Sequence, residues 1–114
     1  MSENQMNGAE ALILSLEKVG IEIAFGIPGG SAIPLYDAMY KVRKKMKFVL
    51  VRHEQNAAHE ADGYARATGK PAAVLVTSGP GATNTVTGIL TAYMDSVPMI
   101  VITGQSVRGM LGKD

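Results

Sequence analysis

The feature that most constrains the fold is a fourfold alternation of short apolar segments with longer helix-like ones. The apolar segments begin about 25 residues apart, which is the spacing of consecutive strand–helix units. Strands are therefore expected at residues 21–25, 47–51, 72–76 and 98–103. Their apolar residues are consecutive rather than alternating, as in strands that are covered on both faces of a parallel sheet. The sequence thus predicts an α/β fold with three layers, α/β/α, around a mainly parallel sheet of about four strands.

Helix signals lie between the predicted strands. Asn7 and Glu10 have the spacing of a capping box, and Gly20 is placed to end the helix that they begin. Pro34 falls in the first turn of a second helix, where its missing N–H costs little. The predicted helices run from residue 7 to residue 20, from 31 to 44, from 54 to 68, and from just after residues 80–81 to near residue 94.

Length and composition narrow the class of protein. A chain of 114 residues with 46% hydrophobic side chains fits one globular domain, so residues 1–114 are expected to form a single domain. The net charge of +1 gives no general attraction to nucleic acid. The absence of Cys excludes disulfides and thiolate metal sites. No apolar run approaches the roughly 18 residues that a membrane span needs, so we expect no membrane partner and a cytoplasmic location.

The unusual residues follow the predicted strands. Glycines and polar side chains gather in four stretches, at residues 26–30, 52–56, 77–81 and 104–105. In an open parallel sheet these stretches emerge at one edge, formed by the carboxyl ends of the strands, and such folds bind ligands there. The glycines let the backbone approach a ligand closely. The alternative is that they serve only to form turns. Neither the dinucleotide nor the mononucleotide phosphate fingerprint is present.

Glu54 is the strongest candidate for a catalytic residue, because it lies between a predicted apolar strand and an alanine-rich helix, where its carboxylate is expected to be partly desolvated. Taken alone, a Glu in the first turn of a helix is commonly a solvated partner of the helix dipole. His53 and His59 are six residues apart, which is not the spacing of two ligands on one helical face, so we expect no metal site. Ser78 lacks the Gly-x-Ser-x-Gly pattern of a hydrolase nucleophile.

Four ordered motifs cover nearly the whole chain and are far more specific together than singly. They are FGIPGG (25–30), VRHEQNAAH (51–59) with ADGYAR (61–66), VTSGPGATN (76–84), and YMDSVP (93–98) with ITGQ (102–105). Together they closely resemble the N-terminal, pyrimidine-binding domain of acetolactate (acetohydroxyacid) synthase large subunits, which are thiamine diphosphate enzymes. The resemblance implies a truncated domain of this kind, since the pyrimidine domain of the family is longer than this chain.

The resemblance also implies a mechanism. Glu54 matches the glutamate that hydrogen-bonds the N1′ atom of the cofactor's aminopyrimidine and favours its imino tautomer. The tautomer's nitrogen then takes the proton from the thiazolium C2 carbon, and the resulting carbanion attacks the carbonyl of a 2-oxo acid. After loss of CO₂, addition to a second pyruvate gives 2-acetolactate, and addition to 2-oxobutyrate gives its homologue in branched-chain amino acid biosynthesis.

Further residues receive roles from the same resemblance. The residues implied to line the pyrimidine or pack around it are Pro28, Gly29, Gly30, Thr77, Pro80 and Asn84, and Gln105 is implied to point toward the substrate entrance. In the family, a separate C-terminal domain holds the diphosphate and its Mg²⁺, and a middle domain mostly holds FAD where it is present. We therefore expect an inactive fragment of a longer enzyme, or one half of a split enzyme, that assembles as a homo-oligomer with shared sites.

Several alternatives stay open at this point. Glyoxylate carboligase, pyruvate oxidase and benzoylformate decarboxylase share much of this domain, and Ser106-Val107 departs from the Val-Pro of many synthases beside the substrate channel. A non-catalytic module that pairs with a full-length subunit is a second class of function. A flavodoxin-like nucleotide-binding domain is a third, against which the absence of both phosphate fingerprints counts.

Overall fold

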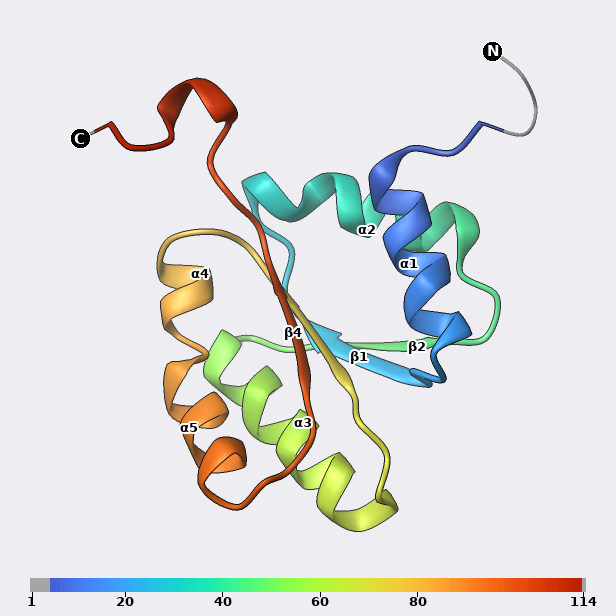
Figure 1. The fold of residues 1–114 in the computed structure, drawn as a ribbon, viewed down its shortest axis with the longest axis vertical. Helices are drawn as coiled ribbons and strands as arrows, with labels where there is room; N and C mark the ends of the chain where they lie inside the picture. The colour runs from blue at the N-terminus through green and yellow to red at the C-terminus, as the bar shows by residue number, and fades with distance from the viewer. Residues whose placement is uncertain (1–4, 114) are drawn as a thin grey trace.

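A computed structural model describes residues 5–113 of the chain (Figure 1). In chain order its elements are α1 (Gly8–Lys18), β1 (Ile23–Gly26), the short 3₁₀ helix η1 (Gly30–Ala32), α2 (Ile33–Val42), β2 (Lys47–Leu50), α3 (Glu54–Thr68), β3 (Ala73–Val76), α4 (Pro80–Thr83), α5 (Val86–Met94), β4 (Ile100–Thr103) and a second 3₁₀ turn, η2 (Arg108–Met110). Within these residues the strands form one four-stranded sheet in the order β2-β1-β3-β4, and every pairing is parallel.

Helices cover both faces of the sheet. Figure 1 shows α1 and α2 on one side of the sheet and α3 with α5 on the other. The central strands divide their side chains between two cores: Ala24, Ala73 and Leu75 pack with α1 and α2, whereas Phe25, Val74 and Val76 pack with α3. This alternation across a strand buries every residue of β3, so the apolar run is consecutive in the sequence. The expected three-layer α/β fold is confirmed.

The helix boundaries differ from the prediction at one informative place. The capping box of α1 is present, with Asn7 Oδ1 accepting from Glu10 N at 2.8 Å and Glu10 Oε2 accepting from Asn7 N at 3.2 Å. The single helix expected after residues 80–81 is wrong, because it is divided into α4 and α5. The buried Thr85 causes the break: its N–H and its hydroxyl both donate to the carbonyl oxygen of Ala82, which tightens the turn.

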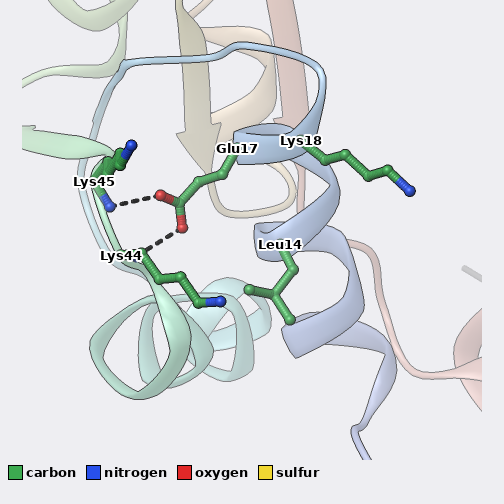
Figure 2. A pocket seen from close by; sticks show the side chains of 5 residues that line it. All are labelled: Leu14, Glu17, Lys18, Lys44 and Lys45. Carbon is green, nitrogen blue, oxygen red and sulfur yellow. Dashed lines mark hydrogen bonds between the residues drawn. The ribbon is translucent and has the colours of Figure 1, made fainter.

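Glu17 lies at the amino-terminal ends of the strands and holds the turn that leads into β2. Its carboxylate accepts three backbone N–H bonds from the turn before β2: from Lys44 at 2.8 Å, from Lys45 at 2.6 Å and from Met46 at 3.1 Å. Figure 2 shows this side chain pointing from α1 toward the turn, beside a cavity of about 270 Å³. Burial opposes ionisation of Glu17, but the three donors outweigh it, so the pKa of this carboxyl lies below its usual value.

The lowered pKa of Glu17 predicts a pH-dependent stability. Because the folded state holds the carboxylate more tightly than the unfolded chain does, Glu17 stabilises the fold above its unfolded pKa, and this stabilisation is lost as the pH falls through the folded pKa. We expect Glu17→Gln to lower the free energy of unfolding by roughly 1 kcal/mol at pH 7, after allowance for solvent screening. Urea unfolding followed by circular dichroism should show the difference shrinking toward pH 3. A difference that is constant with pH would contradict the assignment, and the exposed Glu60→Gln is the matched control.

Candidate functional site

The parallel sheet brings the four unusual stretches to one edge, as predicted. The loops after β1, β2, β3 and β4 all leave the carboxyl ends of their strands, and helices begin directly after three of them. The carboxyl ends of the strands lie opposite the amino ends, where Glu17 binds the turn before β2. The carboxyl edge is therefore the place in the fold where a ligand can meet backbone N–H groups and side chains from several units at once.

Glu54 and Asn84 meet at this edge. Glu54 is the first residue of α3, which His53 caps by accepting the N–H of Gln55 on Nδ1 at 3.0 Å. The Glu54 side chain is half-buried, and its Oε1 accepts a hydrogen bond of 3.0 Å from Asn84 Nδ2. Asn84 is the last residue before the break at Thr85 and caps the C-terminus of α4. No further donor to this carboxylate occurs in the described part of the chain, so Oε2 keeps its capacity to accept a hydrogen bond.

Thr77 is packed between two glycines beside Glu54. A Cβ atom added at Gly29 would lie 2.5 Å from both Cβ and Cγ2 of Thr77. One added at Gly81 would lie 2.6 Å from Thr77 Cγ2 and 3.8 Å from Oε2 of Glu54. Neither glycine has a left-handed backbone, so what they provide is space. They let the loops after β1 and β3 close on one another around Thr77, and Gly81 also lies beside Oε2 of Glu54.

The two glycines differ in a way that can be tested. In Gly81→Ala the new methyl group would strike only Cγ2 of Thr77, since the Cβ of Thr77 is 3.5 Å away. We expect this variant to lose about 1–2 kcal/mol of stability from overpacking, and Thr77→Ser, which removes Cγ2, to restore most of the loss. Gly29→Ala also strikes the Cβ of Thr77 and should not be rescued. Urea unfolding of the single and double variants checks this, and equal rescue of both would contradict the packing.

Among residues 5–113, the remaining predicted site residues form no hydrogen bond with the Glu54 side chain. Pro28, Gly30 and Pro80 are exposed on the same edge of the sheet. Gln105 is also exposed, and its side-chain oxygen accepts from the N–H of the following Ser106 at 2.9 Å. It lines a cavity of about 270 Å³ between α1, α2 and the end of β4, whose lining does not include Glu54. The structure thus brings Glu54, Asn84, Gly29 and Thr77 together, and the roles of all these residues toward a ligand stay predictions.

Comparison with known proteins agrees with this geometry. A family model described as "Thiamine pyrophosphate enzyme, N-terminal TPP binding domain" matches residues 6–114. The chain belongs to this family. It is 54% identical over 110 residues to the acetolactate synthase large subunit of Haemophilus influenzae and 57% identical over 112 residues to the acetolactate synthase of Arthrospira platensis. Each alignment covers 96% of this chain and 19% of the relative.

A third relative gives the same result. The acetolactate synthase large subunit of Lactococcus lactis is 51% identical over 112 residues, which cover 98% of this chain and 19% of that protein. The resemblance found in the motifs is confirmed at the level of the family. The chain spans about a fifth of the length of these curated relatives, because each alignment covers 19% of the relative.

In this TPP binding domain, two neighbours of the site had no signal in the sequence. The phenol of Tyr36, on α2, donates a 2.6 Å hydrogen bond to the carbonyl oxygen of Leu75 near the end of β3. Burial, together with the negative charge of Glu54, raises the pKa of Tyr36, so the phenol keeps its proton and this bond. The second neighbour is Ser31, whose hydroxyl contacts the Thr77-Ser78 loop. In the sequence, nothing distinguishes Tyr36 or Ser31 from other residues of a helix.

The described part of the TPP binding domain contains neither a cluster of metal ligands nor a helix that could span a membrane. Within residues 5–113, no three His, Asp or Glu side chains are grouped so that they could hold a metal ion. His53 caps the N-terminus of α3. Nε2 of His59 lies 3.5 Å from Nε2 of Gln55. Over the same residues, none of the helices has the length and apolar character needed to cross a bilayer.

Proposed function

We propose that this chain is the N-terminal, pyrimidine-binding part of an acetolactate synthase. The enzyme condenses two molecules of pyruvate, or pyruvate with 2-oxobutyrate, with loss of CO₂ in branched-chain amino acid biosynthesis. The relatives carry that name, and they match nearly the whole chain at more than half of its positions. The observation that carries the proposal is the half-buried carboxylate of Glu54, with one oxygen bonded to Asn84 and the other beside Gly81.

The residues at the edge fit an aminopyrimidine ring. When bound, thiamine diphosphate supplies a carbon nucleophile that attacks the carbonyl of a 2-oxo acid. Glu54 would accept a hydrogen bond from the protonated N1′ of the ring on Oε2 and hold the proton there. Asn84 fixes the carboxylate by donating to Oε1, so the second oxygen is oriented before the ligand arrives. Thr77, held between Gly29 and Gly81, supplies an apolar methyl group as part of the wall.

Other parts of the longer protein would complete the site. In our proposal the diphosphate, its Mg²⁺ and any FAD are held by other domains of the longer enzyme, as the family resemblance implies. The exposed residues Pro28, Gly30 and Pro80 at this edge support a cover from a second domain or a second subunit. We propose a homo-oligomer in which the second subunit provides it. The cytoplasmic location expected from the sequence belongs to the same proposal.

A chimera tests the function directly. The segment of the Haemophilus influenzae large subunit that aligns with this chain would be replaced by the corresponding residues of this chain. We expect the purified chimera to form acetolactate from pyruvate only when thiamine diphosphate and Mg²⁺ are present. A folded chimera that binds the cofactor but makes no acetolactate would contradict the proposal. Assays with glyoxylate, benzoylformate and pyruvate plus an electron acceptor distinguish the related carboligase, decarboxylase and oxidase activities.

A further inference from the structure

The hydroxyl of Ser31 joins two of the loops at the carboxyl edge. Ser31 lies in η1, directly after Gly29 and Gly30, and is half-buried. Its Oγ lies 2.9 Å from Oγ1 of Thr77 and donates to Oγ of Ser78 at 3.0 Å. It also accepts the backbone N–H of Ser78 at 3.0 Å. A serine hydroxyl has one donor and two acceptor positions, so all three are used if Thr77 donates to Ser31.

This arrangement fixes the rotamer of Thr77. With its hydroxyl turned toward Ser31, the methyl group of Thr77 is the part that faces Gly81, where Oε2 of Glu54 also lies. The loop after β4 contacts the same hydroxyl, because a Cβ added at Gly104 would collide with Oγ of Ser31. One hydroxyl group therefore lies where the loops after β1, β3 and β4 meet.

We propose that Ser31 is a positioning residue for the site of Glu54. Its hydroxyl holds the side chain of Thr77 so that a methyl group, rather than a competing hydroxyl donor, faces Gly81, beside which Oε2 of Glu54 lies. Without this bond Thr77 can rotate about χ1 and turn its hydroxyl toward the carboxylate that receives the pyrimidine. The inference rests on the proposed function, because it assigns Ser31 to the binding of the cofactor's pyrimidine half.

The first measurement needs no ligand. Amide hydrogen exchange of the chain, read residue by residue by NMR, reports the bond from the N–H of Ser78 to Ser31. In Ser31→Ala we expect this amide to exchange about tenfold faster, while the amides of β3 keep their protection. Ser15→Ala is the matched control, since Ser15 also donates a side-chain hydrogen bond, to Ala11 within α1, but lies away from the site. Unchanged exchange at Ser78 would overturn the proposal.

The second measurement reports the cofactor. In the chimera we expect Ser31→Ala to raise the Kd for thiamine diphosphate about five- to tenfold by calorimetry, with little change in the KM for pyruvate. Thr77→Val, which has no hydroxyl to turn, should make the chimera insensitive to Ser31→Ala. Additive effects of the two changes, or a wild-type Kd in Ser31→Ala, would overturn the inference. If Glu54→Gln also leaves cofactor binding and turnover unchanged, the proposed function fails, and the role of Ser31 in cofactor binding fails with it. A wild-type Kd in Ser31→Ala beside an impaired Glu54→Gln overturns the inference alone.

Discussion

Replacing Glu54 with Gln in the chimera is expected to lower kcat about 100- to 10,000-fold, the range typical of a lost general acid–base group. The amide keeps the size of the side chain and its bond to Asn84, because Asn84 can still donate to the remaining carbonyl oxygen. It cannot hold the proton shared with N1′ of the pyrimidine. Acetolactate formation at saturating cofactor measures the loss, and exchange of the cofactor's C2 proton, followed by NMR, locates it at the activation step.

Two further variants make this result specific. Glu54→Asp keeps the charge but shortens the side chain by one methylene group, so it should also lose most of the activity. This variant tests whether the length of the side chain is needed as well as its negative charge. Glu60→Gln removes a carboxylate from the exposed face of the same helix and should leave kcat unchanged. A near-normal rate in Glu54→Gln at saturating cofactor would mean that another group activates the cofactor.

The fold could be predicted because its signals are local. The capping box of α1 lies within four residues of chain, and the buried central strand β3 is marked by consecutive apolar residues. The edge strand β2 is mostly exposed in this chain, although its sequence predicts a strand covered on both faces. The order β2-β1-β3-β4 could not be read in this way, since four short apolar strands of similar composition carry no mark of their neighbours. Periodicity alone does not predict the break between α4 and α5, because the break depends on whether the hydroxyl of Thr85 bonds to the preceding turn or to solvent.

The candidate site was predictable only to the level of the sheet edge. Parallel strands force their carboxyl ends together, so Glu54, Gly29 and Thr77 could be grouped before any coordinates were known. The bond between Glu54 and Asn84 joins residues 30 positions apart in the chain, and no periodic pattern predicts such a pairing. The resemblance named Asn84 as a neighbour of the ring, whereas its amide here donates to the glutamate itself.

Gly88 illustrates how the packing behind the site can be tested, and Gly88→Ala is expected to cost about 2–3 kcal/mol of stability. Gly88 lies on α5 against α3, and a Cβ there would collide with the Cβ of Ala58. The backbone of α3 is also close, because the carbonyl carbon of Ala58 and the nitrogen of His59 would lie 3.1 and 3.2 Å away. A helix backbone cannot move aside as a flexible side chain can. The two helices would have to separate, and with them the helix that carries Glu54.

Gly63→Ala is the matched control, because it makes the same change within α3 at a position with nothing inside 4 Å of the added Cβ. Alanine is the better helix former, so this control should raise the free energy of unfolding by about 0.5–1 kcal/mol. Urea unfolding should therefore move the two midpoints in opposite directions with unchanged slopes. If Gly88→Ala were as stable as Gly63→Ala, helix propensity alone would govern both sites, and α5 would not be what holds α3 and Glu54 in place.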